Sequence, residues 1–242
     1  MIGIGNTDIG KTRTTNQDYI FISDDKIGAL DNLYIVADGI GGHKSGDIAS
    51  RKSIEYFVNA IEETEIEEDD ILDLMMSSLM YSNEEIYNFS KTNKDYENMG
   101  TTFLATTIKD GKIYIVHIGD SRLYGIRNNK IIRMTTDHTY AMDLFKAGVI
   151  TKEEAEVAKE SSILTRALGT NLQIEADALF CDVFSDDIFI MCSDGLNTMI
   201  SDDEIKEIAQ DTILTTEQKV EKMIARANEN GGKDNIAVII IQ

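Results

Sequence analysis

Four aspartates stand where apolar runs of the sequence begin or end, and carboxylates in such positions can bind metal ions. The four come from different parts of the chain: Asp38 follows LYIVA, Asp120 follows IYIVHIG, Asp194 follows IFIMCS, and Asp234 precedes NIAVIII. Strand ends are where a rigid scaffold passes into loops, so side chains there can converge on a cleft. Carboxylates that converge repel one another, so this repulsion must be neutralised. A ligand set of oxygen atoms alone, without Cys or His, favours Mg²⁺ or Mn²⁺ for that role. We therefore predict a metal site built from these aspartates.

Glycines adjoin three of these aspartates, in Asp38-Gly39, Gly119-Asp120 and Asp194-Gly195, and Gly39 is the candidate for a further ligand. A glycine would let its backbone carbonyl approach an ion closely. Asp-Gly pairs after strands are also typical of turns, and a single pair would be better explained as a turn. The repetition at four run ends favours the metal site over four unrelated turns.

The elements that must position these residues are short strands and a few amphipathic helices. Runs rich in Ile, Val, Tyr and Phe predict strands at 33–37, 103–108, 113–118, 123–127, 131–134, 188–192 and 236–241. Tight turns that join antiparallel neighbours are predicted at Asp110-Gly111, Asn128-Asn129 and Ser185-Asp186. Apolar residues at helical spacing predict helices at 48–61, 71–86 and 220–227. Two short helical stretches interrupt the strand pattern at 139–163, which we interpret as an inserted flap.

Length and composition indicate one globular domain covering residues 1–242. The chain is 42% hydrophobic and 27% charged, and no Pro/Gly/Ser-rich linker divides it. A formal net charge of −20 repels nucleic acid backbones and anionic lipid headgroups, so we expect neither as a partner. The sequence has no apolar leader and no run near the roughly 18 apolar residues of a membrane span. A cytoplasmic protein is expected.

The two cysteines do not support cysteine-based phosphate chemistry. Cys181 and Cys192 lie inside apolar segments, which favours buried reduced thiols. A cysteine phosphatase would need an arginine six residues after its nucleophile, but Asp187 and Thr198 stand there.

Eight motifs occur in the order in which metal-dependent protein phosphatases of type 2C carry them. They are TDIGKTRTTNQD (7–18), VADGIGGHKSGDIAS (36–50), MGTT (99–102), HIGDSRLY (117–124), TTDHT (135–139), LTRALG (164–169), CSDGL (192–196) and GGKDNIAVIII (231–241). The sequence thus resembles the bacterial single-domain form of this family over nearly its whole length. The resemblance implies an α+β fold, a four-layer α/β/β/α sandwich with two mostly antiparallel sheets flanked by helices.

The resemblance also implies a role for each aspartate. Asp38 would bridge two Mn²⁺ or Mg²⁺ ions, with the Gly39 carbonyl on one ion and Asp194 and Asp234 on the other. Asp120, together with Asp194, would hold a third and weaker ion.

Two residues of the first motif are implied to act on substrate and water. Arg13 would grip the substrate phosphate, a role that suits a planar and permanently charged donor; a surface salt bridge is the alternative. Asp18 would bind metal-bound water and orient the nucleophile.

The implied activity is that of a phosphoprotein phosphatase acting on phosphoserine and phosphothreonine. A hydroxide that bridges the metals would attack phosphorus directly, without a phosphoenzyme. The implied partners are phosphorylated proteins, including a bacterial Ser/Thr kinase that the enzyme opposes, and we expect a monomer.

Two positions depart from the family pattern. Gln17 stands where many members have Glu and adds no negative charge, which would lower metal affinity. Ile40 stands where eukaryotic members have the His proposed as general acid, so the proton donor is unassigned. His43 could serve only if its loop folds back, and a structural hydrogen bond is the alternative.

The remaining motif residues with titratable or charged groups favour structural roles. His117 alternates within a strand and is interpreted as a core residue, while His138 is interpreted as an anchor for its loop. Internal ion pairs are the interpretation for Arg122 and Arg166.

Two other functions are compatible with parts of this pattern. A catalytically silent module that binds phosphoproteins would have lost metal ligands, whereas Asp38, Asp194 and Asp234 are all present. A partner-switching phosphatase acting on one phosphorylated anti-anti-sigma regulator usually carries sensor domains, and we expect none here. We therefore favour a phosphatase that opposes a kinase over both of these functions.

Overall fold

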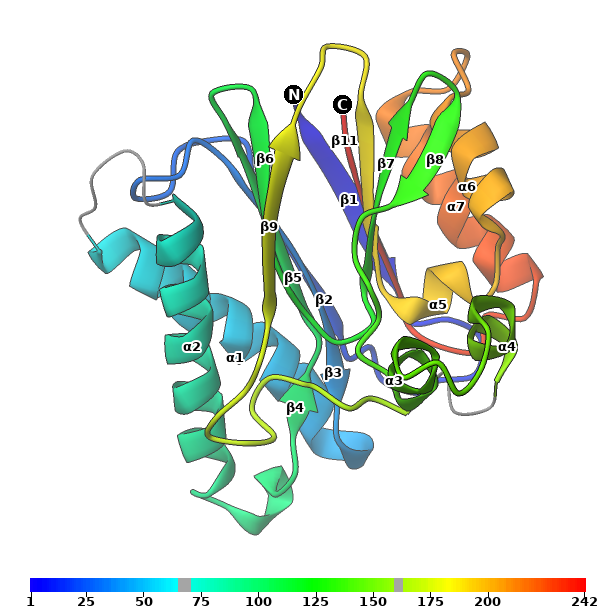
Figure 1. Ribbon diagram of the computed structural model, residues 1–242. Helices are drawn as coiled ribbons and strands as arrows, with labels where there is room; N and C mark the ends of the chain where they lie inside the picture. Colours follow the sequence, from blue (N-terminus) through cyan, green and yellow to red (C-terminus); the bar gives the residue numbers. More distant parts are fainter. Residues whose placement is uncertain (65–70, 159–162) are drawn as a thin grey trace.

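Two β-sheets face each other at the centre of the protein, and helices cover the outer face of each (Figure 1). The computed structural model describes residues 1–64, 71–158 and 163–242, and of residues 42–44, 156 and 157 it describes the backbone alone. One sheet contains, in spatial order, β1 (Gly3–Asp8), β11 (Ile236–Ile241), β10 (Ile188–Cys192), β7 (Arg122–Arg127) and β8 (Lys130–Arg133). The other contains β2 (Asp18–Ser23), β3 (Leu33–Ile40), β5 (Phe103–Lys109), β6 (Lys112–Ile118) and β9 (Asp177–Asp182), with β4 (Gly100–Thr101) paired to β3.

Helices from separate parts of the chain form the two outer layers. The sheet that contains β3 is covered by α1 (Gly42–Glu63) and α2 (Ile71–Ser90), and the sheet that contains β11 by α6 (Asp202–Ala209) and α7 (Thr216–Glu229). Shorter segments are η1 (Lys94–Tyr96), α3 (Tyr140–Lys146), α4 (Lys152–Val157) and α5 (Asp194–Asn197). This arrangement confirms the predicted α+β fold with two flanked sheets. In the part of the chain that the structure describes, no helix combines the length and apolar character needed to cross a bilayer.

The central strands are apolar on both faces because each contributes to two core layers. In β11, Val238 and Ile240 pack in the cluster that contains Met223 of α7, whereas Ile239 and Ile241 lie in the cluster between the sheets. All six residues of β11 are buried. Side chains of a strand alternate between its faces, so a strand held between a helix layer and a second sheet must be apolar throughout.

Two of the predicted turns join adjacent strands, and the third does not. Asp110 and Gly111 connect β5 to β6 with φ of 50° and 71°, and Asn128 and Asn129 connect β7 to β8 with φ of 50° and 61°. Positive φ at both central residues is the geometry of the tight hairpin turn. The prediction for Ser185-Asp186 was wrong: the segment 183–187 links β9 of one sheet to β10 of the other.

All strand pairs among the named elements are antiparallel, as predicted. Strands β1, β2, β4 and β9 and helices α5 and α6 were not predicted. In β9, half-buried and exposed positions alternate strictly from Asp177 to Asp182. Such an edge strand lacks the continuous apolar run that marks a central strand.

Candidate active site

Carboxylates from distant parts of the chain meet at one end of the paired sheets. Asp38 lies in β3 directly opposite Asp18 of β2, and Asp194 begins α5 two residues after β10. Asp120 follows β6 by two residues, and Asp234 precedes β11 by two. A cleft of about 590 Å³ is lined by Thr12, Arg13, Thr14, Thr15, Gln17, Asp38, Gly39, Ile40, Gly41, Thr102, Asp120, Leu164, Asp194, Asp234 and Asn235. The structure therefore brings all five predicted metal-binding residues to a single cleft.

Burial and mutual repulsion disfavour ionisation of these carboxylates in the absence of a cation. Burial, followed by the charges of Asp194 and Asp234, raises the pKa of Asp18 to about 7. Burial and the charge of Asp234 raise the pKa of Asp194 to about 6, although Arg13 acts in the opposite direction. The pKa of Asp38 is raised well above its ordinary value by burial and then by the charges of Asp18 and Asp194.

The same end of the molecule offers oxygen atoms without protein partners. Among the described residues, Asp18 Oδ1 and Asp194 Oδ1 are buried and accept no hydrogen bond. Buried polar atoms are ordinarily paired, and each one left unpaired costs free energy. Oxygen-only ligands that repel one another and lack donors fit hard divalent cations such as Mg²⁺ or Mn²⁺.

Backbone and hydroxyl contacts hold the two innermost carboxylates in place. The Asp38 N–H donates to Thr102 Oγ1 at 2.9 Å, and the Thr102 N–H donates to the Asp38 carbonyl at 2.8 Å. Ser193 Oγ donates to Asp18 Oδ2 at 2.6 Å and accepts from the Ala237 N–H at 2.9 Å. Ser193 and Thr102 lie inside recognised motifs, but sequence reasoning assigned them no role because hydroxyl partners depend on contacts across strands.

Gly39 is required by the close approach of helix α1 to strand β3. A Cβ at Gly39 would lie 2.0 Å from the Gly46 carbonyl oxygen and 2.8 Å from the Gln17 carbonyl oxygen. No side chain fits there, whatever further role the Gly39 carbonyl has. Gln17 lies beside the cleft, where its amide donates to the Gly41 carbonyl at 3.2 Å.

Arg13 is the cation at the mouth of this cleft. Its Nη2 lies 2.6 Å from Asp234 Oδ2, and nearly half of its side chain is exposed. Asn235 secures the N-terminal segment that carries Arg13: its Nδ2 donates to the Ile9 and Thr15 carbonyls, and its Oδ1 accepts from the Gln17 N–H. Asn235 is a third supporting residue that sequence reasoning missed, although it follows Asp234 directly.

Comparison with known proteins identifies the family. A family model described as protein phosphatase 2C matches residues 9–239, nearly the whole chain. The chain belongs to the protein phosphatase 2C family. It is therefore a phosphoprotein phosphatase, and the resemblance inferred from the eight motifs is confirmed.

Relatives of this phosphatase match it over almost their full length. A serine/threonine phosphatase, stp, from Listeria monocytogenes is 33% identical over 240 residues, covering 98% of this chain and 93% of that protein. The solved serine/threonine phosphatase of S. agalactiae is 35% identical with a TM-score of 0.90, covering 98% of this chain and 97% of that one. The catalytic domain of the phosphatase PstP, solved in complex with two manganese ions, is 29% identical with a TM-score of 0.83, covering 98% and 96%. Family membership together with this relative supports metal dependence.

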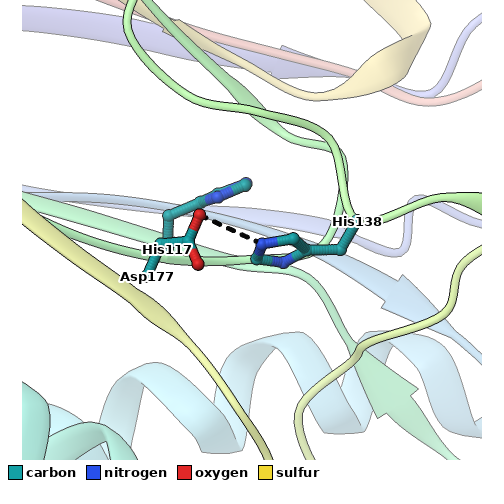
Figure 2. Close-up of side chains that lie close together, drawn as sticks. All are labelled: His117, His138 and Asp177. Carbon is teal, nitrogen blue, oxygen red and sulfur yellow. Dashed lines mark ion pairs between the residues drawn. The ribbon is translucent and has the colours of Figure 1, made fainter. Parts of the chain in front are cut away.

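His117 and His138 do not line the cleft of about 590 Å³ that holds Asp38 and Asp194, the carboxylate cleft. His117 in β6 is fully buried, and the centroid of its ring lies 4.8 Å from that of His138. His138 Nε2 lies 3.3 Å from Asp177 Oδ2, as Figure 2 shows. These positions confirm the core and loop-anchor interpretations. The side chain of His43 lies outside the described residues.

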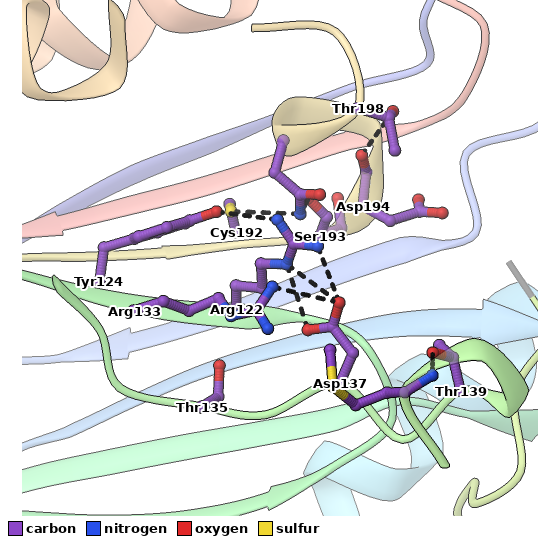
Figure 3. A network of polar contacts seen from close by, with 12 residues as sticks. Arg122, Tyr124, Arg133, Thr135, Asp137, Thr139, Cys192, Ser193, Asp194 and Thr198 are labelled. Carbon is purple, nitrogen blue, oxygen red and sulfur yellow. Dashed lines mark hydrogen bonds and ion pairs between the residues drawn. The ribbon is translucent and has the colours of Figure 1, made fainter. Parts of the chain in front are cut away.

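A second cleft adjoins the first and is built around a buried arginine. Arg122 donates through Nε and Nη2 to the Asp137 carboxylate, with a shortest distance of 2.7 Å, and Arg133 approaches the same carboxylate at 3.6 Å (Figure 3). This confirms the internal ion pair predicted for Arg122. Arg166 lies 3.3 Å from Glu175 and further from Asp177, but both partners are exposed, so the prediction of an internal ion pair was wrong for Arg166.

The second cleft measures about 990 Å³ and shares Asp120 and Asp194 with the carboxylate cleft. Its wall includes Met142 and Phe145 of α3 and Lys152 of α4. The two short helices predicted within 139–163 are present in the described part of that segment, and Thr139 pairs with Leu164 at its base. Residues 159–162 of this segment lie outside the described residues.

Proposed function

We propose that this serine/threonine phosphatase of type 2C removes phosphate from phosphoserine and phosphothreonine in proteins by direct attack of water on phosphorus. The observation that carries the proposal is the group of buried carboxylates at the floor of a cleft whose mouth holds Arg13. Family membership supplies the reaction class, and the carboxylates supply the means of holding cations.

The charges of Asp18, Asp194 and Asp234 act on Asp38, which would offer its carboxylate to two Mn²⁺ or Mg²⁺ ions. The Gly39 carbonyl would help to hold one ion, and Asp194 and Asp234 would hold the other. Asp120, at the boundary between the two clefts, would hold a third and weaker ion with Asp194. When bound, such ions lower the pKa of water towards neutrality and offset the charge of the phosphoryl oxygens.

The residues of the chain orient the reactants around these charges. Arg13 can release Asp234 and present its planar guanidinium to two phosphoryl oxygens. Asp18, held by Ser193, accepts a hydrogen bond from the attacking water and so fixes its direction. Ile40 lines the cleft and carries no titratable group, so the general acid of some relatives has no counterpart at this position.

The proposal extends to the substrates, the location and the oligomeric state of the enzyme. Its substrates are products of a Ser/Thr kinase and include that kinase, and the phosphatase acts as a cytoplasmic monomer. The net charge of −20 disfavours nucleic acid and anionic lipid as partners. Residues 1–242 act as one catalytic domain, in which the segment 139–163 is a flap beside the second cleft.

Metal-dependent hydrolysis of phosphopeptides tests this function. With Mn²⁺ the purified protein is expected to release phosphate from phosphoserine and phosphothreonine peptides, and much more slowly from a phosphotyrosine peptide of the same sequence. Excess EDTA is expected to abolish the release, because the carboxylates without cations can neither activate water nor bind phosphate. Full activity in EDTA would reject the proposal.

Substitution of Arg13 is expected to lower the catalytic efficiency of the phosphatase. Arg13→Ala should lower kcat/KM for a phosphopeptide about 10²-fold, a typical loss for one donor to a charged transition state. Arg13→Lys should recover only part of this loss, because a lysine lacks the planar fork.

Arg127→Ala is the matched control for Arg13. Arg127 pairs with Asp187 at 2.6 Å and has a similarly exposed side chain, but it lies outside the cleft wall. Its replacement should leave kcat/KM unchanged. Equal values for Arg13→Ala and the wild type would show that Arg13 forms only a surface salt bridge.

A further inference from the structure

The backbone of Gly119, directly before Asp120, is held in one conformation by its surroundings. Gly119 has φ of +107°, and a Cβ at this position would lie 2.6 Å from Thr102 Cβ. Only glycine is free of strain there. Asp120 is the next residue, so the backbone conformation of Gly119 determines the direction in which the Asp120 side chain leaves the backbone.

His138 binds Gly119 on both sides of its peptide backbone. The His138 N–H donates to the Gly119 carbonyl at 2.8 Å, and the Gly119 N–H donates to His138 Nδ1 at 3.1 Å. His138 is 1% exposed, so water does not compete for these two bonds. One side chain and its own backbone therefore clamp the residue that precedes Asp120.

The hydrogen bond to Nδ1 also determines the tautomer of His138. A ring nitrogen that accepts from an N–H carries no proton, so the proton of the neutral ring is on Nε2. Nε2 lies 3.3 Å from Asp177 Oδ2 but forms no hydrogen bond there, so the tautomer is assigned from the bond to Gly119 alone (Figure 2). Burial lowers the pKa of His138 and that of the adjacent His117, which favours neutral rings at both positions.

The same three side chains could be taken for a metal site. His117, His138 and Asp177 can each place one ligand atom within 4.8 Å of the others. However, His138 Nε2 cannot bind a metal while it carries the proton that the Gly119 bond requires. The geometry therefore favours a hydrogen-bonded support over a metal-binding group.

We propose that His138 is a positioning residue: by clamping Gly119 it orients the Asp120 carboxylate and so determines the affinity of the phosphatase for the third cation. The inference rests on the proposed function, because it takes Asp120 as a ligand of that cation. The two hydrogen bonds of His138 would then connect the TTDHT segment, where the flap begins, to the carboxylate cleft. Supporting groups of this kind typically change metal affinity about 10- to 100-fold when they are replaced.

Two substitutions distinguish the role of Nδ1 of His138 from that of Nε2. In His138→Asn, Oδ1 lies where Nδ1 lay and can still accept from the Gly119 N–H. In His138→Gln, the polar atoms lie near the former Nε2, so the contact with Asp177 can persist while the bond to Gly119 is lost. Both variants place a neutral amide in the same pocket, which makes each the control for the other.

The first measurement is amide hydrogen exchange in the metal-free proteins. Exchange of the Gly119 N–H should be about fivefold faster in His138→Gln than in the wild type, as expected for loss of one hydrogen bond, and nearly unchanged in His138→Asn. In the wild type, long-range ¹H–¹⁵N correlations should show the proton of His138 on Nε2. A proton on Nδ1, or equal exchange in both variants, would overturn the clamp even if a variant folds poorly.

The second measurement is Mn²⁺ binding followed by calorimetry. The weakest Mn²⁺ site should lose about tenfold in affinity in His138→Gln and change little in His138→Asn. In an Asp120→Asn background, this difference between the two variants should disappear. Equal affinities in the original background, or a difference that survives Asp120→Asn, would overturn the proposal.

These two measurements separate failure of the clamp from failure of the proposed function. If Asp120→Asn alone leaves Mn²⁺ binding unchanged, Asp120 holds no cation and the inference falls with that assignment. The exchange of Gly119 would still report whether His138 clamps it. Stoichiometric Zn²⁺ bound by the wild type and lost in both His138 variants would instead identify a metal site at His117, His138 and Asp177.

Discussion

Asp38→Asn is expected to lower kcat for phosphopeptide hydrolysis by about 10³-fold or more and to stabilise the metal-free protein. Activity should fall because Asp38 is the carboxylate proposed to hold two cations, and a neutral amide would hold them less well. Stability rises because Asp38 is fully buried beside Asp18 and Asp194, where its ionisation is unfavourable. Phosphate release in Mn²⁺ and thermal unfolding in EDTA at pH 8 measure the two effects.

Opposite changes in activity and stability distinguish this result from simple misfolding. Asp24→Asn is the matched control: Asp24 follows β2 and accepts hydrogen bonds from the Gly3 N–H and the Tyr34 hydroxyl, which an amide oxygen can also accept. This variant should retain activity. Retained activity in Asp38→Asn, or lost activity together with a lower melting temperature in EDTA, would contradict the assignment of Asp38.

Removal of metal is expected to destabilise the protein more at high pH than at low pH. Asp18 and Asp194 have pKa values of about 7 and about 6 in the metal-free protein, above the ordinary value of 3.8. A carboxyl group whose pKa is raised by folding stabilises the folded state while it is protonated, and this stability is lost as pH rises through the folded value. From pH 5 to 8, Asp18 and Asp194 alone should cost the metal-free protein on the order of 4 kcal/mol, at about 1.4 kcal/mol per pH unit over two units for Asp18 and one for Asp194.

The experiment compares the free energy of unfolding in Mn²⁺ and in EDTA at several pH values. Bound cations keep the carboxylates ionised, so the gap between the two conditions should widen from pH 5 to 8. His117, whose pKa burial lowers to about 3, acts in the opposite direction below about pH 6.5. This contribution is present in both conditions and cancels in the difference. A gap that is constant or narrows with pH would show that the carboxylate group does not hold the metal.

This expected instability is linked to the proposed activity. A group of like charges in a buried cleft disfavours folding, but it provides a site that cations complete. The surrounding contacts, such as those from Ser193 to Asp18 and from Thr102 to Asp38, hold the carboxylates in place at this cost. The repulsion between buried carboxylates, which destabilises the fold, is thus located where the phosphatase reaction is proposed to occur.

Local chemistry made the central strands and two hairpin turns predictable. β11 and β10 are continuous apolar runs because helices and a second sheet bury both of their faces, and Asp110-Gly111 adopts the positive φ values that its residue types favour. The edge strand β9 alternates between half-buried and exposed positions, and β1 includes two glycines and polar residues, so neither showed such a run. Ser185-Asp186 forms a turn in either topology, and only packing determines that the chain crosses to the other sheet there.

The sequence by itself determined the residue types at the strand ends, the motif order and hence the family, because these depend on neighbours along the chain. Tertiary structure alone decided that Asp18, Asp38 and Asp194 share one buried region and that Arg13 pairs with Asp234 at its mouth. It also decided which groups serve as supports: Ser193 for Asp18, and His138 for Gly119. Burial, repulsion between carboxylates and hydrogen-bond partners depend on distances between segments that lie far apart in sequence, and those distances exist only once the two sheets have packed.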